Sequence, residues 1–433
     1  MGRPLDDARE RCIVIHPNLN ANAPSARSAS SRLSECVGLA VAIDLNIVLS
    51  EVVNVARPRP ATLLGGGAVE RVGQMAEQDE FGIDVIVVDT ALTPIQQRNL
   101  ERAWDRKVID RTGLILEIFG ARAQTKEGRL QVDLAAQTYQ RSRLVRSWTH
   151  LERQRGGAGF MGGPGETQIE TDRRLIDQRI TRLKRDLKDV TRTRELHRKA
   201  RRKVPYPIVA LVGYTNAGKS TLFNRLTNSD VVARDQLFAT LDPTMRGLEL
   251  PSGRSVILSD TVGFVSDLPH ELVNAFHATL EEVMEADLII HVRDCAHPET
   301  HQQRTDVLKV LGDLGVTVNE NKPMIEALNK ADQLDANNAE VLCNQISRSD
   351  SPRYLVSAIT GEGCDTLLDA IDTQITAGYE TLNATLKHQE GAALAWLYQH
   401  GEVIERTDDD TSIKLSVRID SANADRFRRK LFQ

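Results

Sequence analysis

The stretch Ile208–Ser220, IVALVGYTNAGKS, decides the fold of the region around it. Its first five residues are apolar and predict a buried strand. The loop that follows has the pattern GxxxxGK[ST] and leads into a helical run, Thr221–Leu226. Glycines let such a loop curl so that its backbone N–H groups, aided by the helix dipole, face a phosphate group. We therefore predict a nucleotide site in which Lys219 reaches the β- and γ-phosphates and the Ser220 hydroxyl ligates Mg²⁺.

Two segments downstream predict the switch regions of a nucleotide-hydrolysing domain. The first, Phe238–Asp242 (FATLD), contains Thr240, which we prefer over Thr244 as the threonine that completes the Mg²⁺ shell in the triphosphate state. The second follows a predicted β-hairpin and is a DxxG motif, Asp260–Gly263. Its aspartate would act on Mg²⁺ through water, and the glycine N–H would contact the γ-phosphate.

A further pair of motifs predicts that the base is guanine. Asn329–Asp332 (NKAD) follows a predicted strand, and the Asp332 carboxylate can accept hydrogen bonds from guanine N1–H and N2–H₂. Adenine lacks the N2 amine and presents an acceptor at N1, so it would leave a buried charge unpaired. Ser357–Ile359 (SAI) follows the last predicted strand of this region, and its backbone N–H groups would meet guanine O6.

The phosphate loop, DxxG, NKAD and SAI motifs occur in the expected order, each at the end of a strand, and together with the FATLD segment they define the predicted site. The predicted catalytic residues are Lys219, Thr240, Asp260 and Gly263, and the predicted metal-binding residues are Ser220, Thr240 and, through water, Asp260. The other predicted nucleotide-binding residues belong to the same motifs: Gly213, Tyr214, Thr215, Asn216, Ala217, Gly218, Thr221, Phe238, Ala239, Leu241, Asp242, Thr261, Val262, Asn329, Lys330, Ala331, Asp332, Ser357, Ala358 and Ile359.

The composition of the 433-residue chain is that of a soluble globular protein with several domains, since 41% of residues are hydrophobic and 27% charged. No apolar run approaches the roughly 18 residues that would span a bilayer, and the N-terminal residues lack the apolar segment of a secretory signal. The five cysteines lie far apart without a CxxC pair. We therefore expect free thiols in the cytoplasm, and no structural zinc site.

The N-terminal region, residues 1–125, is predicted to be a small parallel α/β domain because strand-like runs alternate with helical ones. The predicted strands are Cys12–His16, Ile47–Val53, Asp84–Val88 and Lys107–Ile109. A helix is expected over Leu33–Leu45 and another from Pro94 to Trp104, whereas Asn18–Ser31 has the composition of a flexible linker. Gly65–Gly67 before a further helix is either a tight turn or an anion site. No motif indicates chemistry in this domain.

Residues 126–203 are predicted to form a basic helical hairpin. Two apolar seams of coiled-coil spacing flank the loop Gly156–Gly165, which contains six glycines. Asp172–Lys203 holds 14 Lys and Arg against five Asp and Glu, a net charge of +9 in a chain of net charge −5. This excess predicts contact with RNA, although a solvated helix face and a simple connecting loop are the alternatives. The predicted RNA-contacting residues are Gly156, Gly157, Phe160, Met161, Gly163, Arg173 and Arg174.

The fold class is therefore predicted as α/β. A P-loop GTPase domain, residues 204–378, follows the small parallel α/β domain and its coiled-coil-like hairpin, and a small α+β domain, residues 379–433, completes the chain. In this last part we expect a helix over Glu390–His400, two strands over Glu402–Arg406 and Thr411–Arg418, and a helix from Ala422 to Leu431.

Three long stretches give the chain a family resemblance. They are PATLLGGGAVE at Pro60–Glu70, GGAGFMGGPGETQIETDRR at Gly156–Arg174 and DTVGFVSDLPHELVNAFHATLEE at Asp260–Glu282. The chain resembles the HflX family of ribosome-associated GTPases, within the translation-factor-related class, over nearly its full length. The resemblance implies a cytoplasmic, partly ribosome-associated monomer that cycles between GTP and GDP and binds the large (50S) subunit. It further implies that the hairpin contacts 23S rRNA and that stalled ribosomes are split.

Phe264 departs from the wider GTPase pattern, because many GTPases carry a water-orienting glutamine directly after DxxG. A phenyl ring cannot orient water, so we expect slow intrinsic hydrolysis that the ribosome accelerates by ordering residues 229–245 and 260–270. Asn216 lies where potassium-activated relatives hold K⁺, and it either binds K⁺ or only stabilises the loop. His270, His277, His291 and His297 are interpreted as surface or packing residues rather than general bases.

Two other functions remain open at this point. The chain could be a checkpoint GTPase for assembly of the large subunit that splits no ribosomes. It could also be an RNA-remodelling protein whose N-terminal domain binds a separate nucleotide. Against the second, residues 1–150 contain no further phosphate loop.

Overall fold

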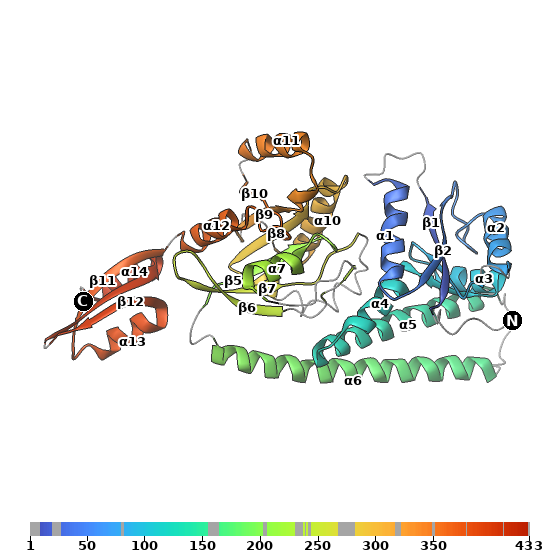
Figure 1. Cartoon of the computed structure of the whole chain (residues 1–433). Coiled ribbons are helices and arrows are strands. Elements are labelled where there is room, and N and C mark those ends of the chain that lie inside the picture. The colour runs from blue at the N-terminus through green and yellow to red at the C-terminus, as the bar shows by residue number, and fades with distance from the viewer. Residues whose placement is uncertain are drawn as a thin grey trace.

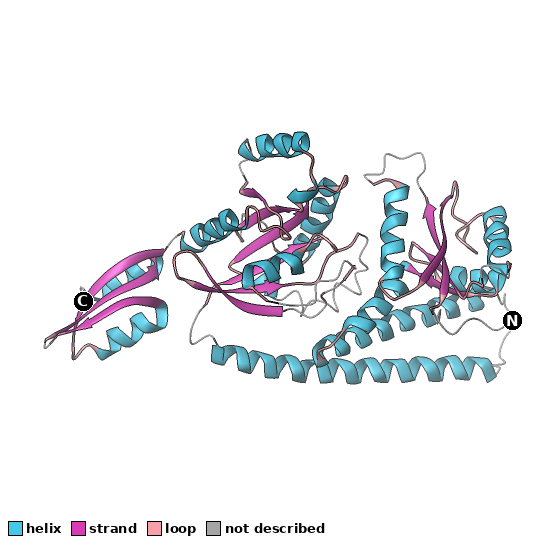
Figure 2. Cartoon of the chain, viewed as in Figure 1, coloured by secondary structure: helices cyan, strands magenta, loops and turns pink. Residues whose placement is uncertain are grey.

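The computed structural model describes residues 9–19, 27–78, 82–154, 164–201, 206–229, 237–238, 240, 244–266, 282–316, 322–348, 351–377, 379–409 and 411–431. Three sheets organise these residues, and a pair of long helices lies beside the first of them, with the second helix of the pair reaching beneath the central sheet as well (Figures 1 and 2). The predicted fold class is confirmed. In the described part of the chain, no helix combines the length and the apolar character needed to cross a membrane.

The N-terminal sheet is fully parallel, with strand order β2-β1-β3-β4. Its strands are β1 (Arg11–Asn18), β2 (Asn46–Asn54), β3 (Val85–Val88) and β4 (Lys107–Asp110). Side chains alternate between two cores, because successive residues of a strand face opposite sides of the sheet. Val14 and Val87 pack on one side, whereas Ile13, Ile15 and Ile86 pack on the other.

Four helices cover this sheet, α1 (Ala29–Val41) and α4 (Arg111–Arg122) in contact with one another, and α2 (Gly66–Glu77) with α3 (Pro94–Trp104). Thr93 and Gln96 form a capping box in front of α3, so the predicted start at Pro94 is confirmed. The expectation of a linker as far as Ser31 is wrong at its end. Ser28 caps α1 through the Ser31 N–H, and α1 begins four residues before the predicted start at Leu33.

The predicted helical hairpin is formed by α5 (Lys126–Gln154) and α6 (Pro164–Arg201), which pack against one another. Ile180 and Leu183 of the α6 seam are buried, and Arg141 of α5 pairs with Asp177 of α6 at 2.7 Å. In Figure 1, α6 runs beneath both the N-terminal domain and the next sheet.

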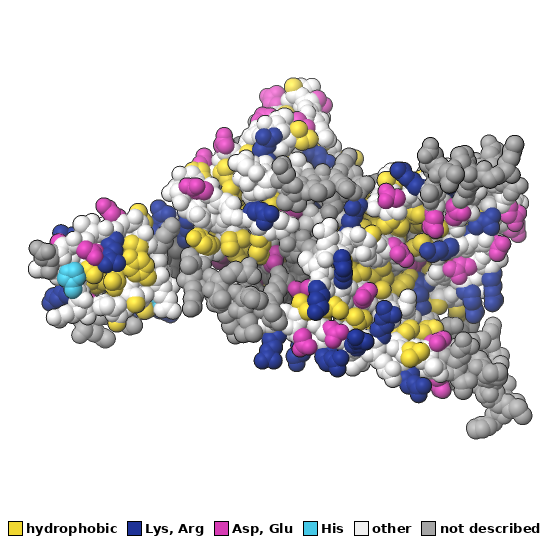
Figure 3. All heavy atoms as spheres, turned by 60° about the horizontal axis from the view of Figure 1, so that its bottom comes forward, with side chains coloured by type: hydrophobic (Ala, Val, Ile, Leu, Met, Phe, Trp, Pro, Cys, Tyr) yellow, Lys and Arg dark blue, Asp and Glu magenta, His cyan; other side chains and the backbone are white. Residues whose placement is uncertain are grey.

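One face of the molecule is formed in part by α6, and Lys and Arg side chains are spread over it among Asp and Glu (Figure 3). The exposed basic residues on α6 include Arg173, Arg174, Arg179, Arg182, Lys184, Arg185 and Lys188. Over the part of α6 whose side chains the structure describes, basic side chains are therefore displayed to solvent.

The central sheet has strand order β10-β9-β8-β5-β7-β6, and only β6 is antiparallel to its neighbour. The strands are β5 (Ile208–Gly213), β6 (Thr244–Glu249), β7 (Ser255–Asp260), β8 (Leu288–Asp294), β9 (Met324–Asn329) and β10 (Arg353–Leu355). Among the described residues of this domain, the helices are α7 (Lys219–Thr227), α10 (Thr300–Asp313), α11 (Ala336–Ser347) and α12 (Cys364–Thr376), with the short 3₁₀ turn η1 (Ala331–Gln333). The predicted β6–β7 hairpin is confirmed.

The C-terminal domain is a three-stranded antiparallel sheet, in the order β11-β13-β12, with two helices. Its elements are β11 (Tyr379–Lys387), α13 (Gly391–His400), β12 (Gly401–Asp408), β13 (Ser412–Asp420) and α14 (Ser421–Leu431). The expectation of two strands missed β11. Its sequence, YETLNATLK, does alternate, with Leu382, Ala384 and Leu386 buried, but its polar and small residues lower its strand propensity.

Candidate functional site

The phosphate loop lies between the end of β5 and the start of α7. Lys219, the first residue of α7, is buried, and its Nζ donates hydrogen bonds to the carbonyl oxygens of Gly213 at 3.1 Å and Tyr214 at 2.9 Å. Burial lowers the pKa of Lys219 to about 8, although the nearby Asp260 carboxylate opposes this shift. The lysine is thus held over the loop by backbone oxygens of the loop itself.

Three oxygen-bearing side chains from separate segments converge next to this lysine. Ser220 Oγ donates to Asp260 Oδ2 at 2.7 Å, Thr240 Oγ1 donates to the same oxygen at 2.9 Å, and the two hydroxyl oxygens lie 2.8 Å apart. Burial raises the pKa of Asp260. Its Oδ1 is also buried and has no hydrogen-bonded partner among the described residues. Hydroxyl and carboxylate oxygens are the donors that Mg²⁺ prefers, so this cluster fits that ion.

Gly263 brings the DxxG segment into contact with the phosphate loop. A Cβ atom at this position would lie 2.8 Å from Thr215 Cγ2 and 3.0 Å from Lys219 Nζ, so a side chain there would displace its neighbours. The backbone holds this approach, since the Thr215 N–H donates to the Phe264 carbonyl at 2.7 Å and the Phe264 N–H donates to the Gly213 carbonyl at 3.1 Å.

The other end of the site is organised by Asn329. Its Nδ2 donates to the Ala217 carbonyl at 2.9 Å, and its Oδ1 accepts the Ala358 N–H at 2.9 Å, so it ties the phosphate loop to the SAI segment. Gly218 has a φ of +90°, and a Cβ there would lie 2.2 Å from Asn329 Nδ2. Only glycine suits this approach.

Asp332 lies beside the SAI segment, as the specificity argument requires. Its Oδ1 accepts a hydrogen bond from Ser357 Oγ at 2.6 Å, and Ser357 Oγ accepts the Thr360 N–H at 3.1 Å. Lys330 pairs with Asp294 at 2.8 Å. Asp332 is exposed, and so is Ile359. The arrangement can therefore bind a base at the Asp332 end, and phosphates with a metal ion at the Lys219 end.

Not every predicted nucleotide-binding residue directs its side chain to this site. The Phe238 ring is buried against Phe119 of α4, with centroids 4.6 Å apart, and Thr261 Oγ1 donates to the Leu211 carbonyl at 2.6 Å inside the sheet. Ala239, Leu241 and Asp242 lie outside the described residues, as do Gly156, Gly157, Phe160, Met161 and Gly163 of the hairpin loop.

Phe264 is only 2% exposed and belongs to a hydrophobic cluster that is continuous with the N-terminal domain. The predicted packing role is confirmed for His291, which is buried in β8 with its pKa lowered to about 3 by that burial. His297 is half-buried, and its Nδ1 accepts the Glu299 N–H at 3.1 Å. His270 and His277 lie outside the described residues.

A polar network between the N-terminal and nucleotide-binding domains escaped the sequence analysis. Arg111 donates to Asp89 at 2.6 Å, to Glu35, and to Ser266 Oγ and O at 3.1 and 3.0 Å. Glu35 also accepts the Tyr214 hydroxyl. Burial alone would raise the pKa of Glu35, but the Arg111 guanidinium and the Tyr214 hydroxyl hold it below its ordinary value. The sequence offered one indication of this network, because Asp89 directly follows the buried strand β3, where polar side chains often belong to a site.

The described residues contain no group of three or more His, Cys, Asp or Glu side chains that could hold a metal ion, and the five cysteines are free thiols. The Mg²⁺-compatible cluster uses hydroxyl oxygens instead, which leaves coordination positions to phosphate oxygens and water.

Comparison with known protein families divides the chain into four matches. Residues 30–120 match the family described as "GTP-binding GTPase N-terminal", and residues 122–201 match "GTP-binding GTPase Middle Region". Residues 208–330 match "50S ribosome-binding GTPase", and residues 344–433 match "HflX C-terminal domain".

Individual relatives are similar over most of the chain. A protein named GTPase HflX from Magnetococcus marinus is 50% identical over 380 residues, which cover 88% of this chain and 86% of the relative. The protein of the same name from Escherichia coli is 43% identical over 364 residues, covering 85% and 82%. A crystal structure described as SsGBP in complex with GDP is 21% identical, covers 85% of this chain and 99% of its own, and has a TM-score of 0.48.

Proposed function

Since the chain belongs to the HflX family of GTPases, we propose that it binds Mg²⁺–GTP through the motif residues described above and couples hydrolysis to action on the large ribosomal subunit. The observation that carries the nucleotide site is the convergence of Ser220, Thr240 and Asp260 beside Lys219, with Asp332 and Ser357 at the opposite end. These residues come from five separate segments, and a nucleotide is the ligand that needs all of them.

Each residue has a defined part in holding the nucleotide. Ser220 and Thr240 would ligate Mg²⁺, and Asp260 would hold one of its waters. The ion supplies charge neutralisation for the β- and γ-phosphates. Lys219 exchanges the carbonyl oxygens of Gly213 and Tyr214 for phosphate oxygens, to which its positive charge is better matched.

The guanine end supplies specificity. The Asp332 carboxylate accepts from N1–H and N2–H₂, and Ser357 holds it in position. Asn329 links this end to the phosphate loop, so the distance between the base site and the phosphate site is fixed.

Hydrolysis by the protein alone should be slow. Phe264 stands directly after DxxG, and its ring is buried in the hydrophobic cluster rather than free to orient water. Acceleration then requires a partner that orders the switch residues around the attacking water, and we propose that the ribosome is this partner.

Contact with the large subunit is supported by the exposed basic residues of α6 and by the match of residues 208–330 to ribosome-binding GTPases. Arg173 and Arg174 are exposed there and suit phosphate oxygens of rRNA. We propose that GTP orders the switches, that this form binds the large subunit through the hairpin, and that binding separates the two subunits before hydrolysis releases the factor.

The test is GTP turnover of the purified protein alone, with large subunits and with intact ribosomes, with subunit separation followed by light scattering. Stimulation by large subunits and GTP-dependent loss of scattering are expected. Stimulation without loss of scattering would favour the assembly checkpoint, and no stimulation in either sample would contradict the ribosomal role. Arg173→Glu with Arg174→Glu should weaken stimulation, whereas turnover of the protein alone should stay unchanged.

A further inference from the structure

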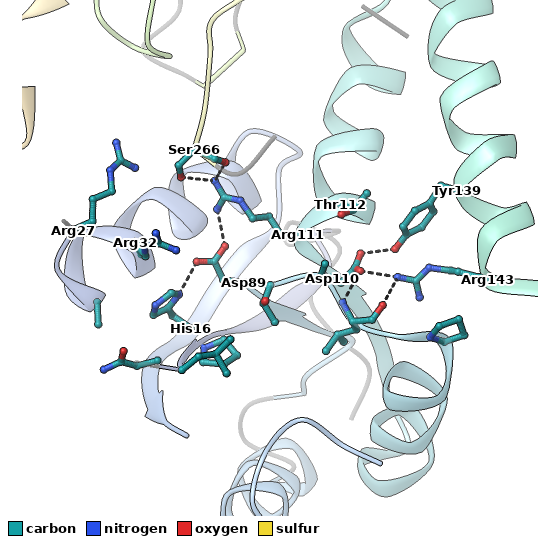
Figure 4. A pocket seen from close by; sticks show the side chains of 18 of the residues that line it. His16, Arg27, Arg32, Asp89, Asp110, Arg111, Thr112, Tyr139, Arg143 and Ser266 are labelled. Carbon is teal, nitrogen blue, oxygen red and sulfur yellow. Dashed lines mark hydrogen bonds and ion pairs between the residues drawn. The ribbon is translucent and has the colours of Figure 1, made fainter. Parts of the chain in front are cut away.

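A cavity of about 440 Å³ opens at the carboxyl edge of the N-terminal sheet, apart from the nucleotide site (Figure 4). Its lining includes His16 in β1, Asp89 directly after β3, Asp110 at the end of β4, and Ser266 from the segment after DxxG. A cavity of this volume is in the range of small-molecule sites.

The position of the cavity follows from the strand order. The chain passes from β1 to β2 on one side of β1, and then returns to β3 on its other side. The connection that leaves the carboxyl end of β1 and the one that leaves the carboxyl end of β3 therefore run in opposite directions. In open parallel sheets, ligands bind in the crevice that such a reversal creates.

The carboxylate oxygens that line the cavity are already engaged. Asp89 accepts from Arg111 Nη1 at 2.6 Å and from His16 Nδ1 at 2.8 Å, one bond to each oxygen. Asp110 Oδ1 accepts the Gly113 N–H at 2.8 Å and the Tyr139 hydroxyl at 2.5 Å. Its Oδ2 accepts the Leu92 N–H at 3.0 Å and Arg143 Nη2 at 2.6 Å. Figure 4 shows these as two separate sets of side chains in the cavity wall.

Arginine side chains outnumber these carboxylates in the cavity wall, since Arg27, Arg32, Arg111 and Arg143 line it beside Asp89 and Asp110. The Nε atoms of Arg111 and Arg143 are buried and have no hydrogen-bonded partner among the described residues. Arg32 of α1 also lines the cavity and is only partly buried. A ligand that complements such a wall must bring acceptors, and negatively charged oxygens are the acceptors that arginine binds most strongly.

The few aromatic side chains of the wall indicate whether the ligand also carries a nucleobase. Tyr139 is the only Phe, Tyr or Trp side chain among the described lining residues. The Arg143 guanidinium lies over the Tyr139 ring, 4.2 Å from its centroid, so a cation already covers that face of the ring. The cavity thus lacks the free aromatic face on which proteins commonly stack a nucleobase.

We propose that this cavity is a second ligand site, which takes a small oxyanion without a nucleobase, either a phosphate monoester or a polycarboxylate, and binds it through Arg32, Arg111 and Arg143. The site goes beyond the guanine-nucleotide function, because it shares no residue with the phosphate loop or with the NKAD and SAI motifs.

Calorimetry on the full-length protein tests this site. The protein is first saturated with Mg²⁺ and GDP, so that added anions cannot bind in the guanine-nucleotide site. Ribose 5-phosphate, inorganic phosphate and succinate, a dicarboxylate that binds Mg²⁺ only weakly, are then titrated at ionic strength matched with NaCl. Saturable binding of a phosphate compound or of succinate is expected. The compound that binds more tightly shows whether the natural ligand carries a phosphate or a carboxylate group. Absence of saturable binding for all three probes overturns the proposal.

Two variants localise the binding. Arg143→Gln should weaken it about tenfold or more, the effect of losing one charge-assisted hydrogen bond. Arg98→Gln, an exposed residue of α3 outside the cavity, is the matched control and should bind as the native chain does. Equal weakening in both variants would mean that the anions are attracted only by the net charge of the protein, and it would overturn the proposal.

Ala91→Leu tests the cavity without removing a charge. Ala91 is exposed and lines the cavity, so a larger side chain should reduce binding while the thermal unfolding temperature stays close to that of the native chain. Unchanged binding in this variant would place the ligand elsewhere. Tighter binding of AMP than of ribose 5-phosphate would contradict a ligand without a base.

Discussion

Tyr214 and Ser266 are joined by a hydrogen bond from the Ser266 backbone N–H to the Tyr214 phenolic oxygen, 2.8 Å long and spanning 52 residues of sequence. Arg27 donates to the same oxygen at 3.0 Å, and the hydroxyl itself donates to Glu35. One oxygen atom of the phosphate loop therefore contacts the segment after DxxG and two side chains of the N-terminal domain.

Removal of this oxygen should destabilise the protein. Tyr214→Phe leaves the Ser266 N–H and the charged groups of Arg27 and Glu35 with one partner fewer in a buried setting, which costs about 1–3 kcal/mol. The free energy of unfolding in urea measures this loss. Tyr206→Phe is the control, because Tyr206 is half-exposed, and it should stay within about 0.5 kcal/mol of the native chain. A Tyr214→Phe chain as stable as that control would contradict the assigned role of the network.

Gly263→Ala should impair the GTP-bound form. The new Cβ would meet Thr215 Cγ2 at 2.8 Å and Lys219 Nζ at 3.0 Å, which costs about 1–3 kcal/mol if the segment must keep its place near the γ-phosphate. GTP affinity should fall more than GDP affinity, as measured by competition with a fluorescent nucleotide. Gly247→Ala in β6 meets nothing within 4 Å and should leave both affinities unchanged. Equal loss of GTP and GDP affinity would argue against a γ-phosphate contact.

Asp332→Asn should reduce GTP affinity about a hundredfold or more, because one acceptor oxygen is replaced by an NH₂ group that faces the guanine donors. Nucleotide competition gives the change directly. Asp335→Asn is the matched control, since Asp335 caps α11 through the Asn338 N–H and asparagine caps equally well. Retention of native GTP affinity in Asp332→Asn would exclude Asp332 as the guanine acceptor.

Acid should destabilise the protein in part through His291. Its pKa is lowered from 6.5 to about 3, so the unfolded chain binds the proton first and stability falls as pH decreases below about 6.5. Between pH 7 and pH 5 this term amounts to about 2 kcal/mol. His291→Gln should therefore lose less stability than the native chain over that interval, as followed by urea unfolding at each pH. Parallel losses in the two proteins would show that His291 does not contribute.

K⁺ should support faster GTP turnover than Na⁺ if Asn216 is a ligand of that ion. Asn216 is exposed in the phosphate loop, and its φ of +59° is left-handed. Asn216→Gly keeps the left-handed backbone without strain and should abolish the difference between KCl and NaCl. Equal turnover of the native chain in both salts would leave Asn216 with the loop-stabilising role alone.

Local patterns explain why much of the fold was predictable. The phosphate loop, the DxxG segment and the capping box of Thr93 are each set by a few consecutive residues, and periodicity located the hairpin helices. The positions of Asp260 and Asn329 at the ends of β7 and β9 followed from the same signals, because parallel strands bring their carboxyl ends to one edge of the sheet.

The interdomain network could not be predicted in this way. Glu35 and Arg111 lie 76 residues apart, and Arg111 and Ser266 lie 155 residues apart, so no local pattern links them. The contact of Glu35 with Arg111 depends on how α1 packs on α4, and the contact of Arg111 with Ser266 depends on how the N-terminal domain docks on the central one. Phe238 was likewise assigned to the nucleotide because of its motif, whereas docking places its ring against Phe119.

The helix α6 ends at Arg201, and β5, which carries the phosphate loop at its far end, begins at Ile208. With 38 residues, α6 is about 57 Å long. A helix of that length acts as a lever arm. A tilt of about 5° at its carboxyl end would carry its amino end through about 5 Å, close to the pitch of one helical turn. A change of angle too small to disturb the packing of the central sheet would therefore move the amino end of α6 by several ångströms.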